Sequence, residues 1–205
     1  MNSDLPYAQA CENNKAPILE RLQELFVAPG KVLEIGTYTG QHAVHFATAM
    51  PHLQWQPSDH PESAHLCRAR LEQAALPNIL PMVELDVGDA NWPIEEFQWA
   101  FSANTAHIMA WPEVEKMFHG IGERLTEDGA FCLYGPFNEK GEYTSDSNRR
   151  FDQHLRSQAP HMGIRDLTDL STLAELAGMR LMENHPMPAN NQLLVFRLVN
   201  DLPIS

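Results

Sequence analysis

The sequence predicts an α/β fold in which one mostly parallel sheet of seven strands carries helices on both faces. Two observations lead to this prediction. Along residues 16–178, short apolar runs alternate with amphipathic segments, and strands joined by helices lie parallel in one sheet. Near the carboxyl end, two apolar runs are separated only by PANN, so they form a hairpin and must be antiparallel.

The expected strands are short apolar runs bounded by Gly, Pro or Asn. The first, KVLEI at 31–35, is apolar almost throughout, which suits a strand covered on both faces. The others are 53–58, 78–85, 97–103, 129–135, 179–187 and 191–199.

The expected helices carry apolar residues three and four positions apart. In the first, at 16–26, Ile18, Leu22 and Leu25 share one face, and Pro17 suits the first turn, where it needs no N–H partner. The remaining helices are 41–50, 61–75 with Pro61 at its start, 112–125, 147–158 and 169–178.

Length and composition indicate one globular domain. Of 205 residues, 43% are hydrophobic and 20% are charged, which is enough to bury a core. We expect an N-terminal helical segment (1–28), a cofactor-binding core (31–135) and a carboxyl-terminal part (136–205) with a substrate loop, helices and the hairpin. No feature of the sequence indicates an oligomeric state.

Charge and cysteine content disfavour several classes of partner. The formal net charge of −13 repels nucleic-acid phosphates, which are bound mainly by Lys and Arg. The N-terminus lacks a signal-peptide pattern, and no apolar run approaches the roughly 20 residues of a membrane span. The three cysteines form no C-x-x-C pair, and no Cys/His spacing resembles a metal site. We therefore expect a cytoplasmic protein that binds no nucleic acid, membrane or metal.

The loop after the first expected strand is a candidate cofactor site, because ligands of open α/β sheets bind beyond the carboxyl ends of strands. Its glycines let a ligand approach the backbone, and the N-terminus of the next helix offers free N–H groups to a carboxylate. The G-x-G-x-x-G pattern of pyrophosphate cofactors is absent. A simple tight turn is the alternative. The candidate residues are Glu34, Gly36, Thr37, Tyr38, Gly40 and His42.

Acidic residues follow the next two expected strands. Asp59 can accept hydrogen bonds from both hydroxyls of a ribose. Asp86 can accept from the exocyclic amine of adenine while the N–H of Val87 donates to a ring nitrogen. Taken singly, Asp59 suits a helix N-cap and Asp86 a solvated loop. Taken together, three strand ends and the hairpin predict the Rossmann-like class I fold of S-adenosylmethionine (SAM) methyltransferases, with SAM as the cofactor.

Several longer segments resemble one family. They are ENNKAPIL, VLEIGTYTGQHAVHFA, WQPSD, LDV, ANTAHI, YGPFNEKGEYTSDSNRRFDQHLR, GIRDL and MPANNQLLVFR, and they span nearly the whole chain. On these segments the chain resembles the methyltransferase-like twenty-six family, small SAM-methyltransferase-like proteins long described as a domain of unknown function. The resemblance implies a class I fold and SAM binding, and it implies no particular substrate.

One position departs from that family. Its first loop usually reads E-I-A-S-G-T-G-Q-H, whereas here Tyr38 replaces the middle glycine and Gly36 replaces the alanine. A non-glycine residue held at positive φ is strained by about 1–3 kcal/mol. We therefore expect Gly36 to absorb the unusual backbone geometry and the ring of Tyr38 to pack beside the methionine end of the cofactor pocket.

His107 is the candidate catalytic residue, because it follows the fourth expected strand beside the expected methyl group. A neutral imidazole can accept a proton near pH 7 or orient an acceptor. Asn104, on the same loop, is expected both at the cofactor and as a group that orients the acceptor. The alternative for His107 is a packing role at the end of a strand.

The long polar loop after the fifth expected strand is typical of lids and binding segments. Tyr134, Phe137 and Asn138 are expected to line an acceptor pocket there. The alternative is a capped start of the next helix, with Ser145 or Ser147 as the N-cap.

Two further pairs of residues are candidates. Asn13 and Lys15 precede the first expected helix and are expected to fold over the cofactor, with Lys15 at its carboxylate; a solvated N-terminus is the alternative. Asn190 and Asn191 are expected near the substrate, although Asn also favours tight turns for local reasons.

The leading hypothesis is a SAM-dependent methyltransferase that acts on an unidentified small molecule, with a basic peptide as a second kind of acceptor. The main alternative is a non-catalytic SAM-binding or scaffold protein of the same fold, favoured by Tyr38 and by the lack of a clear base. A nicotinamide-dependent oxidoreductase is disfavoured because G-x-G-x-x-G is missing.

Overall fold

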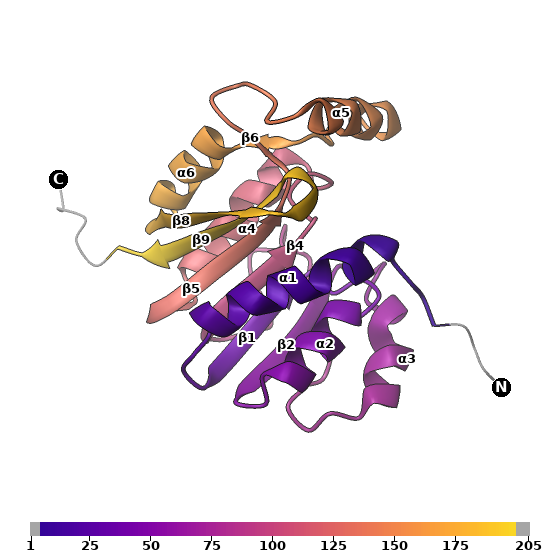
Figure 1. The fold of residues 1–205 in the computed structure, drawn as a ribbon. Helices are drawn as coiled ribbons and strands as arrows, with labels where there is room; N and C mark the ends of the chain where they lie inside the picture. Colours follow the sequence, from indigo (N-terminus) through magenta and orange to yellow (C-terminus); the bar gives the residue numbers. More distant parts are fainter. Residues whose placement is uncertain (1–4, 200–205) are drawn as a thin grey trace.

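The computed structural model describes residues 5–199, and its centre is a seven-stranded sheet of order β3-β2-β1-β4-β5-β9-β8 (Figure 1). The strands are β1 (Gly30–Ile35), β2 (Leu53–Asp59), β3 (Val83–Glu84), β4 (Phe97–Ala103), β5 (Leu125–Gly135), β8 (Met179–Met187) and β9 (Asn191–Leu198). Neighbours from β3 to β5 pair in parallel, and β9 pairs antiparallel with both β5 and β8. Within this sheet only β9 therefore runs against the others, which confirms the mostly parallel sheet and the carboxyl-terminal hairpin.

The order of the strands reverses beside β1. The chain places β2 and β3 on one side of β1 and then returns to place β4 on the other side. Ile35, at the end of β1, is level with Ser58 of β2 and Ser102 of β4, so these strands end at one edge. In open α/β sheets such a reversal leaves a crevice at the carboxyl edge, where ligands bind.

Helices cover both faces of the sheet (Figure 1). They are α1 (Gln9–Leu25), α2 (Gln41–Ala49), α3 (His65–Ala74), α4 (Trp111–Gly122), α5 (Asp146–Gln158) and α6 (Leu167–Leu176). α1 and α2 bury Ile18, Leu22 and Phe46 against one face, and α4 and α6 pack on the other. Within residues 5–199, no helix has the length and apolar character needed to cross a membrane.

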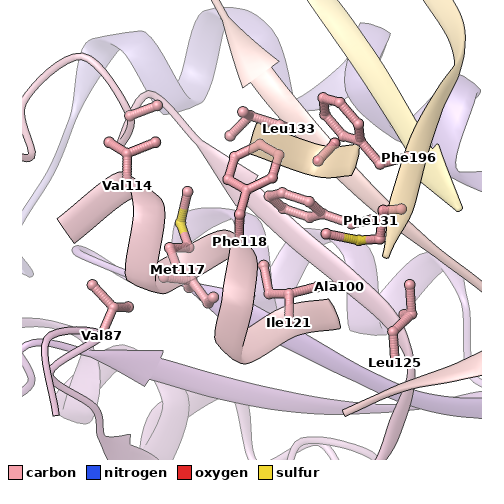
Figure 2. Close-up of a cluster of buried hydrophobic side chains, with 14 of the residues drawn as sticks. Val87, Ala100, Val114, Met117, Phe118, Ile121, Leu125, Phe131, Leu133 and Phe196 are labelled. Atoms are coloured by element: carbon pink, nitrogen blue, oxygen red, sulfur yellow. The ribbon is translucent and has the colours of Figure 1, made fainter. Parts of the chain in front are cut away.

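The core beneath α4 shows how a helix buries one face of the sheet. Phe118 of α4 is fully buried and meets Phe131 of β5 and Phe196 of β9 edge to face, with ring centroids 5.4 and 5.2 Å apart (Figure 2). Such aromatic pairs add about 0.5–1.5 kcal/mol to the burial of their surface. The buried residues of α4 recur three and four positions apart, as Val114, Met117, Phe118 and Ile121.

α1 begins earlier than predicted. It starts at Gln9, so Pro17 lies inside the helix and not in its first turn. The missing N–H of Pro17 removes one intrahelical hydrogen bond, and packing against the sheet holds the helix instead. Leu25, predicted on the buried face, is only partly buried. The buried positions repeat every four residues: Asn14, Ile18, Leu22 and Phe26.

Other elements also differ from the prediction. β3 is limited to Val83–Glu84 because Pro81 has no N–H with which to continue the ladder. α3 begins at His65 and not at Pro61, since residues 61–64 form a separate turn. β6 (Phe137–Asn138) and β7 (Arg165–Asp166) form a small parallel sheet that was not predicted, because two residues are too few to reveal any period.

Candidate functional site

A cavity of about 590 Å³ lies at the carboxyl edge of the sheet, where the strand order reverses. Its volume is within the range of roughly 300–1,000 Å³ that is usual for cofactor and small-molecule sites. The loops after β1, β2, β3 and β4 and the start of α1 line it. Most of the predicted cofactor residues lie there: Gly36, Thr37, Tyr38, His42, Asp59, Asp86, Val87 and Asn104.

The loop after β1 turns through three left-handed residues. Gly36, Tyr38 and Gly40 have φ of 80°, 50° and 77°. A Cβ on Gly36 would lie 2.4 Å from Cγ2 of Thr105, so glycine is required there both by φ and by space. The expectation that Gly36 alone absorbs the unusual geometry is wrong, because Tyr38 is itself left-handed. The Tyr38 ring is half-exposed at the cavity.

Asp59 explains the conformation of Tyr38. Its Oδ2 accepts a hydrogen bond from the backbone N–H of Tyr38 at 2.6 Å, and its Oδ1 accepts from that of His60 at 2.8 Å. Asp59 is therefore no N-cap of α3, which begins at His65. Burial raises the pKa of the Asp59 carboxyl, and these backbone N–H groups oppose the rise. Each carboxylate oxygen can accept a further hydrogen bond from a ligand.

Asp86 and Val87 form a paired acceptor and donor in the loop after β3. Oδ1 of Asp86 accepts from the N–H of Gly88 at 2.7 Å, and Oδ2 lies 3.7 Å from Nε2 of His60. The backbone N–H of Val87 donates to no residue that the structure describes. An adjacent carboxylate oxygen and free N–H suit a ring that carries an amine beside a ring nitrogen.

Glu34 lies beneath the loop and does not line the cavity. It is fully buried, and its Oε2 accepts from Nε1 of Trp55 at 2.9 Å and from Oγ1 of Thr37 at 3.1 Å. Burial raises the pKa of Glu34 to about 7. Glu34 therefore supports the loop from below. Gly40, which also lies outside the cavity lining, allows α2 to begin close to Cys67 of α3.

The amino end of α1 covers part of the cavity. Ala8 and neighbouring residues line it, and the N–H of Ala8 donates to Oε1 of Gln41 at 2.7 Å. Arg70 of α3 donates to the carbonyl oxygens of Pro6 at 2.6 Å and Thr39 at 2.8 Å. Arg70 thus ties the segment before α1 to the loop after β1.

Neither Lys15 nor Asn13 lies at this cavity. Lys15 pairs with Glu12 and lines a separate cavity of about 320 Å³ between α1 and α2. Asn13 is exposed and accepts a hydrogen bond from Gln9, one turn earlier. Both side chains point away from the cavity, because residues 9–16 are helical and the helix turns Asn14 toward the protein interior instead.

Asn14 is that residue, and the sequence analysis missed it. It is buried, and its Oδ1 lies 2.7 Å from Nε2 of His42, which lines the cavity. Burial lowers the pKa of His42 to about 4, so its ring is neutral. The spacing of four residues from Asn14 to Ile18 and Leu22 was the signal that could have identified it.

His107 is a buried, neutral base. Burial, with a smaller effect of the Arg165 charge, lowers its pKa to about 4. Its ring meets Phe151 of α5 edge to face at 5.2 Å. Neither ring nitrogen hydrogen-bonds to any residue within 5–199. His107 does not line the cavity, although Asn104 and Ile108 of the same loop do.

Arg165 holds the loop that carries His107. Its guanidinium donates to the carbonyl oxygens of Ala106 at 2.8 Å and of Met109, and it lies over the ring of Trp111. Backbone carbonyl oxygens therefore accept hydrogen bonds from the Arg165 guanidinium. Through these bonds β7 holds the loop that follows β4.

The other predicted substrate residues lie outside the cavity lining. Tyr134 is buried under α1, and burial raises the pKa of its phenol while Asn14 opposes the rise. Phe137 is buried in the core, and Asn138 in β6 has a buried Oδ1 with no partner among the described residues. Each of these side chains is placed by β5 or by the small sheet.

The hairpin turn is fastened to α5. The Asn190 side chain donates to Oγ of Ser147 at 3.0 Å, and the Asn190 backbone carbonyl accepts from the Asn148 side chain at 3.0 Å. The Asn191 side chain donates to the carbonyl oxygen of Pro188. Ser145 is the N-cap of α5, which confirms one of the two capping residues considered. Asn190 therefore joins the hairpin turn to α5, and Asn191 stabilises the turn itself.

A metal site has no support within the part of the chain that the structure describes, because no group of three or more His, Cys, Asp or Glu side chains could hold an ion. Carboxylates, backbone N–H groups and the side chains of His42 and His60 contribute to the polar lining instead.

Comparison with known proteins gives a family and a fold. The family model described as "Protein of unknown function (DUF938)" matches residues 5–198. An O-methyltransferase family 2 protein from Planctomyces limnophilus, in complex with apigenin, superposes with a TM-score of 0.80 at 15% identity, over 93% of this chain and 58% of that one.

Two other solved structures are similar. The mitomycin 7-O-methyltransferase MmcR gives a TM-score of 0.73 at 16% identity, over 90% of this chain and 55% of that chain. CalO1, a methyltransferase in calicheamicin biosynthesis in its S-adenosylhomocysteine (SAH) bound form, gives a TM-score of 0.73 at 17% identity, over 90% of this chain and 54% of that chain. The chain thus spans little more than half the length of these proteins, and at such identities the likeness shows the fold.

Proposed function

The chain belongs to the DUF938 family and has the class I SAM-methyltransferase fold, and from this premise we propose that it is a SAM-dependent methyltransferase acting on a small-molecule acceptor. The observation that carries the proposal is the convergence of Asp59, Asp86 and the Val87 amide on one cavity at the strand reversal. The resemblance to the methyltransferase-like twenty-six family and a cytoplasmic location are parts of the same proposal.

The residues present fit SAM. Asp59 retains acceptor capacity for ribose hydroxyls, and Asp86 with Val87 offers an acceptor and a donor for an adenine edge. Free N–H groups at the start of α2 suit a carboxylate. The carboxylates of the lining also favour a cationic ligand over a neutral one.

SAM supplies a methyl group on a sulfonium centre, and transfer needs an acceptor placed in line with it. The loop after β4 would place that acceptor, because Asn104 lines the cavity and His107 lies on the same turn. Neutral His107 can hold the proton that an acceptor hydroxyl or amine gives up. The start of α1 covers part of the cavity and would limit access of water from that side.

Binding of SAM and SAH, measured by calorimetry and by the shift in melting temperature, tests the proposal. A ligand at 100 times its Kd stabilises the native state by about 2.7 kcal/mol. If neither compound binds or raises the melting temperature, the proposal is wrong. Tighter binding of NADH, measured by its fluorescence, would favour an oxidoreductase instead.

A non-catalytic SAM-binding protein is the second candidate. It is favoured by the position of His107, whose ring nitrogens bond to no residue that the structure describes and which lies outside the cavity lining. Formation of SAH from SAM in the presence of any acceptor, above the rate without acceptor, separates the two candidates in favour of the enzyme.

A further inference from the structure

His42, on the first turn of α2, lines the cavity although it is only 6% exposed. Its Nε2 lies 2.7 Å from Oδ1 of Asn14, whereas its Nδ1 hydrogen-bonds to no residue that the structure describes. Within residues 5–199, the buried side-chain nitrogens and oxygens that lack a partner are Nε2 of His45 and Oδ1 of Asn138. Nδ1 of His42 is not one of them, so it reaches accessible space, and the space that His42 lines is the cavity.

Asn14 decides which nitrogen of this ring carries the proton. An amide oxygen only accepts, so Nε2 of His42 carries a hydrogen and donates it to Oδ1 of Asn14. The Asn14 side chain also opposes the rise in the pKa of the Tyr134 phenol, as an amide N–H beside the phenol oxygen does. Burial lowers the pKa of His42 to about 4, so the ring is neutral near pH 7 and Nδ1 keeps its lone pair. His42 therefore presents a hydrogen-bond acceptor to the cavity.

Two aromatic rings hold the imidazole in this orientation. Phe46, one turn later on α2, stacks on it with centroids 5.2 Å apart and planes 7° apart. Phe101 of β4 meets it edge to face at 5.9 Å, and both phenylalanines are fully buried. A ligand that donates to Nδ1 of His42 thus meets an acceptor that is already oriented, which lowers the entropic cost of binding.

The amino-acid end of SAM carries the groups that fit the start of α2. The backbone N–H groups of Gln41, His42 and Ala43 donate to no residue that the structure describes, and such a helix start favours a carboxylate. The carboxylate and the ammonium of an α-amino acid are attached to one carbon, so a carboxylate at these N–H groups brings the ammonium within reach of the same helical turn. An ammonium only donates, and Nδ1 of His42 only accepts.

The charges around the cavity also favour an ammonium group. Its lining includes the carboxylates of Asp59, Glu62, Asp86 and Glu113. Within residues 5–199, no Lys or Arg lines it. A concave site lined by charges of one sign attracts the opposite sign. The field therefore draws a cation into the cavity, and the neutral ring of His42 offers it an oriented acceptor.

We propose that His42, oriented by Asn14, binds the α-ammonium group of SAM through Nδ1, and that this bond makes the cavity specific for cofactors with a complete amino-acid end. His42 is a positioning residue in this assignment, because holding the methionine part helps to fix the direction of the sulfonium methyl group. The inference rests on the proposed function, since it concerns how that cofactor is held.

The test compares three ligands by calorimetry. They are SAH, its deamino counterpart, in which hydrogen replaces the ammonium, and 5′-methylthioadenosine, which lacks the amino-acid end. The wild type should bind SAH about tenfold or more tightly than the deamino compound, as expected for a hydrogen bond to a charged group. His42→Phe should bind these two compounds with nearly equal affinity and should bind 5′-methylthioadenosine like the wild type.

Two sets of variants distinguish a ligand contact from a structural role. His45→Phe makes the same change one turn later on α2, outside this cavity, and should keep the preference for SAH over the deamino compound. Asn14→Leu removes the group that orients His42 and should weaken that preference several-fold. Asn14→Asp retains an acceptor for Nε2 of His42 and should keep it.

Histidine side-chain nitrogen spectra provide a readout that does not depend on affinity. The His42 signals should show a proton on Nε2 and none on Nδ1. SAH should shift the Nδ1 signal of His42, whereas the deamino compound should not. The signals of His119, which is exposed on α4, should stay unchanged with both ligands.

The outcomes separate this inference from the proposed function. If none of the three compounds binds, both are wrong. If SAH binds without preference over the deamino compound, or if His42→Phe retains the preference, the assignment of His42 is wrong and the proposed function stands. If His42→Phe no longer binds 5′-methylthioadenosine, the wild-type spectra decide, and an unchanged Nδ1 signal with SAH rejects the assignment.

Discussion

The backbone N–H of Tyr38 donates to Oδ2 of Asp59 at 2.6 Å, so the loop after β1 is joined to the end of β2. This bond is made while Tyr38 has a φ of 50°, a conformation that favours glycine. The loop therefore accepts backbone strain at the residue that positions the carboxylate expected to meet the ribose.

Tyr38→Gly should relieve this strain and keep the N–H that Asp59 accepts. We expect the free energy of unfolding to rise or stay within about 1 kcal/mol, since glycine removes strain but gains entropy when unfolded. SAH affinity should be equal or higher. Urea unfolding and calorimetry measure both quantities, and a loss of affinity above tenfold would show that the ring is a required contact.

Ala189→Gly is the matched control for that variant. Ala189 has a φ of 59° in the exposed hairpin turn, and it is not part of the cavity lining. The change should affect stability in the same direction and leave SAH affinity unchanged.

Asp59→Asn should weaken SAH binding by about 10- to 100-fold, because a hydrogen bond to a charged acceptor contributes about 1.5–3 kcal/mol. The amide oxygen can still accept from Tyr38, and only the bond from the N–H of His60 is lost, so the fold should survive. Asp128→Asn, at an exposed position, is the control and should bind SAH like the wild type. Unchanged affinity in the Asp59 variant would exclude Asp59 from the cofactor site.

Glu34 should make the protein less stable as the pH rises. Its pKa is raised by burial from an ordinary 4.5 to about 7, so the folded state holds a proton that the unfolded state releases. This contribution is complete below pH 4.5 and is lost as the pH rises to 7, by about 3 kcal/mol.

Glu34→Gln should remove that slope, because glutamine can still accept from Trp55 and Thr37 but does not ionise. Urea unfolding from pH 4.5 to 7.5 should show the difference, with the exposed change Glu20→Gln as the control. Parallel curves for wild type and Glu34→Gln would contradict the prediction.

Arg70→Ala should release the segment that covers the cavity, because Arg70 bonds to the carbonyls of Pro6 and Thr39. We expect faster hydrogen exchange in residues 5–11 and faster dissociation of SAH, by several-fold. Arg68→Ala, at an exposed position of the same helix, should change neither. Stopped-flow dissociation and exchange mass spectrometry measure the two effects.

The sheet could be predicted because its signals are local. Apolar runs such as 31–35 identify strands without tertiary information, and alternation with helices makes them parallel. Asp59 and Asp86 could be placed together for the same reason, since the carboxyl ends of parallel strands meet at one edge.

The remaining features depend on contacts between distant segments. Asn14 could be distinguished from Asn13 only once the start of α1 was known, because a shift of one residue turns the side chain by about 100°. The hydrogen bond between Tyr38 and Asp59 joins the loop after β1 to the end of β2, 21 residues further along the chain, so no local sequence pattern indicates the φ of Tyr38. His107 and Gly135 come together only through the pairing of β4 with β5.

The position of β9 has a consequence for synthesis of the chain. β5 ends at residue 135, but its outer edge is covered only by residues 191–198, and Phe196 completes the ring cluster around Phe118. Until those residues leave the ribosome, β5 is an unprotected edge strand beside an incomplete core, the state in which chains aggregate or recruit chaperones. A stop codon shortly before β9 should therefore yield inclusion bodies and not a smaller folded protein.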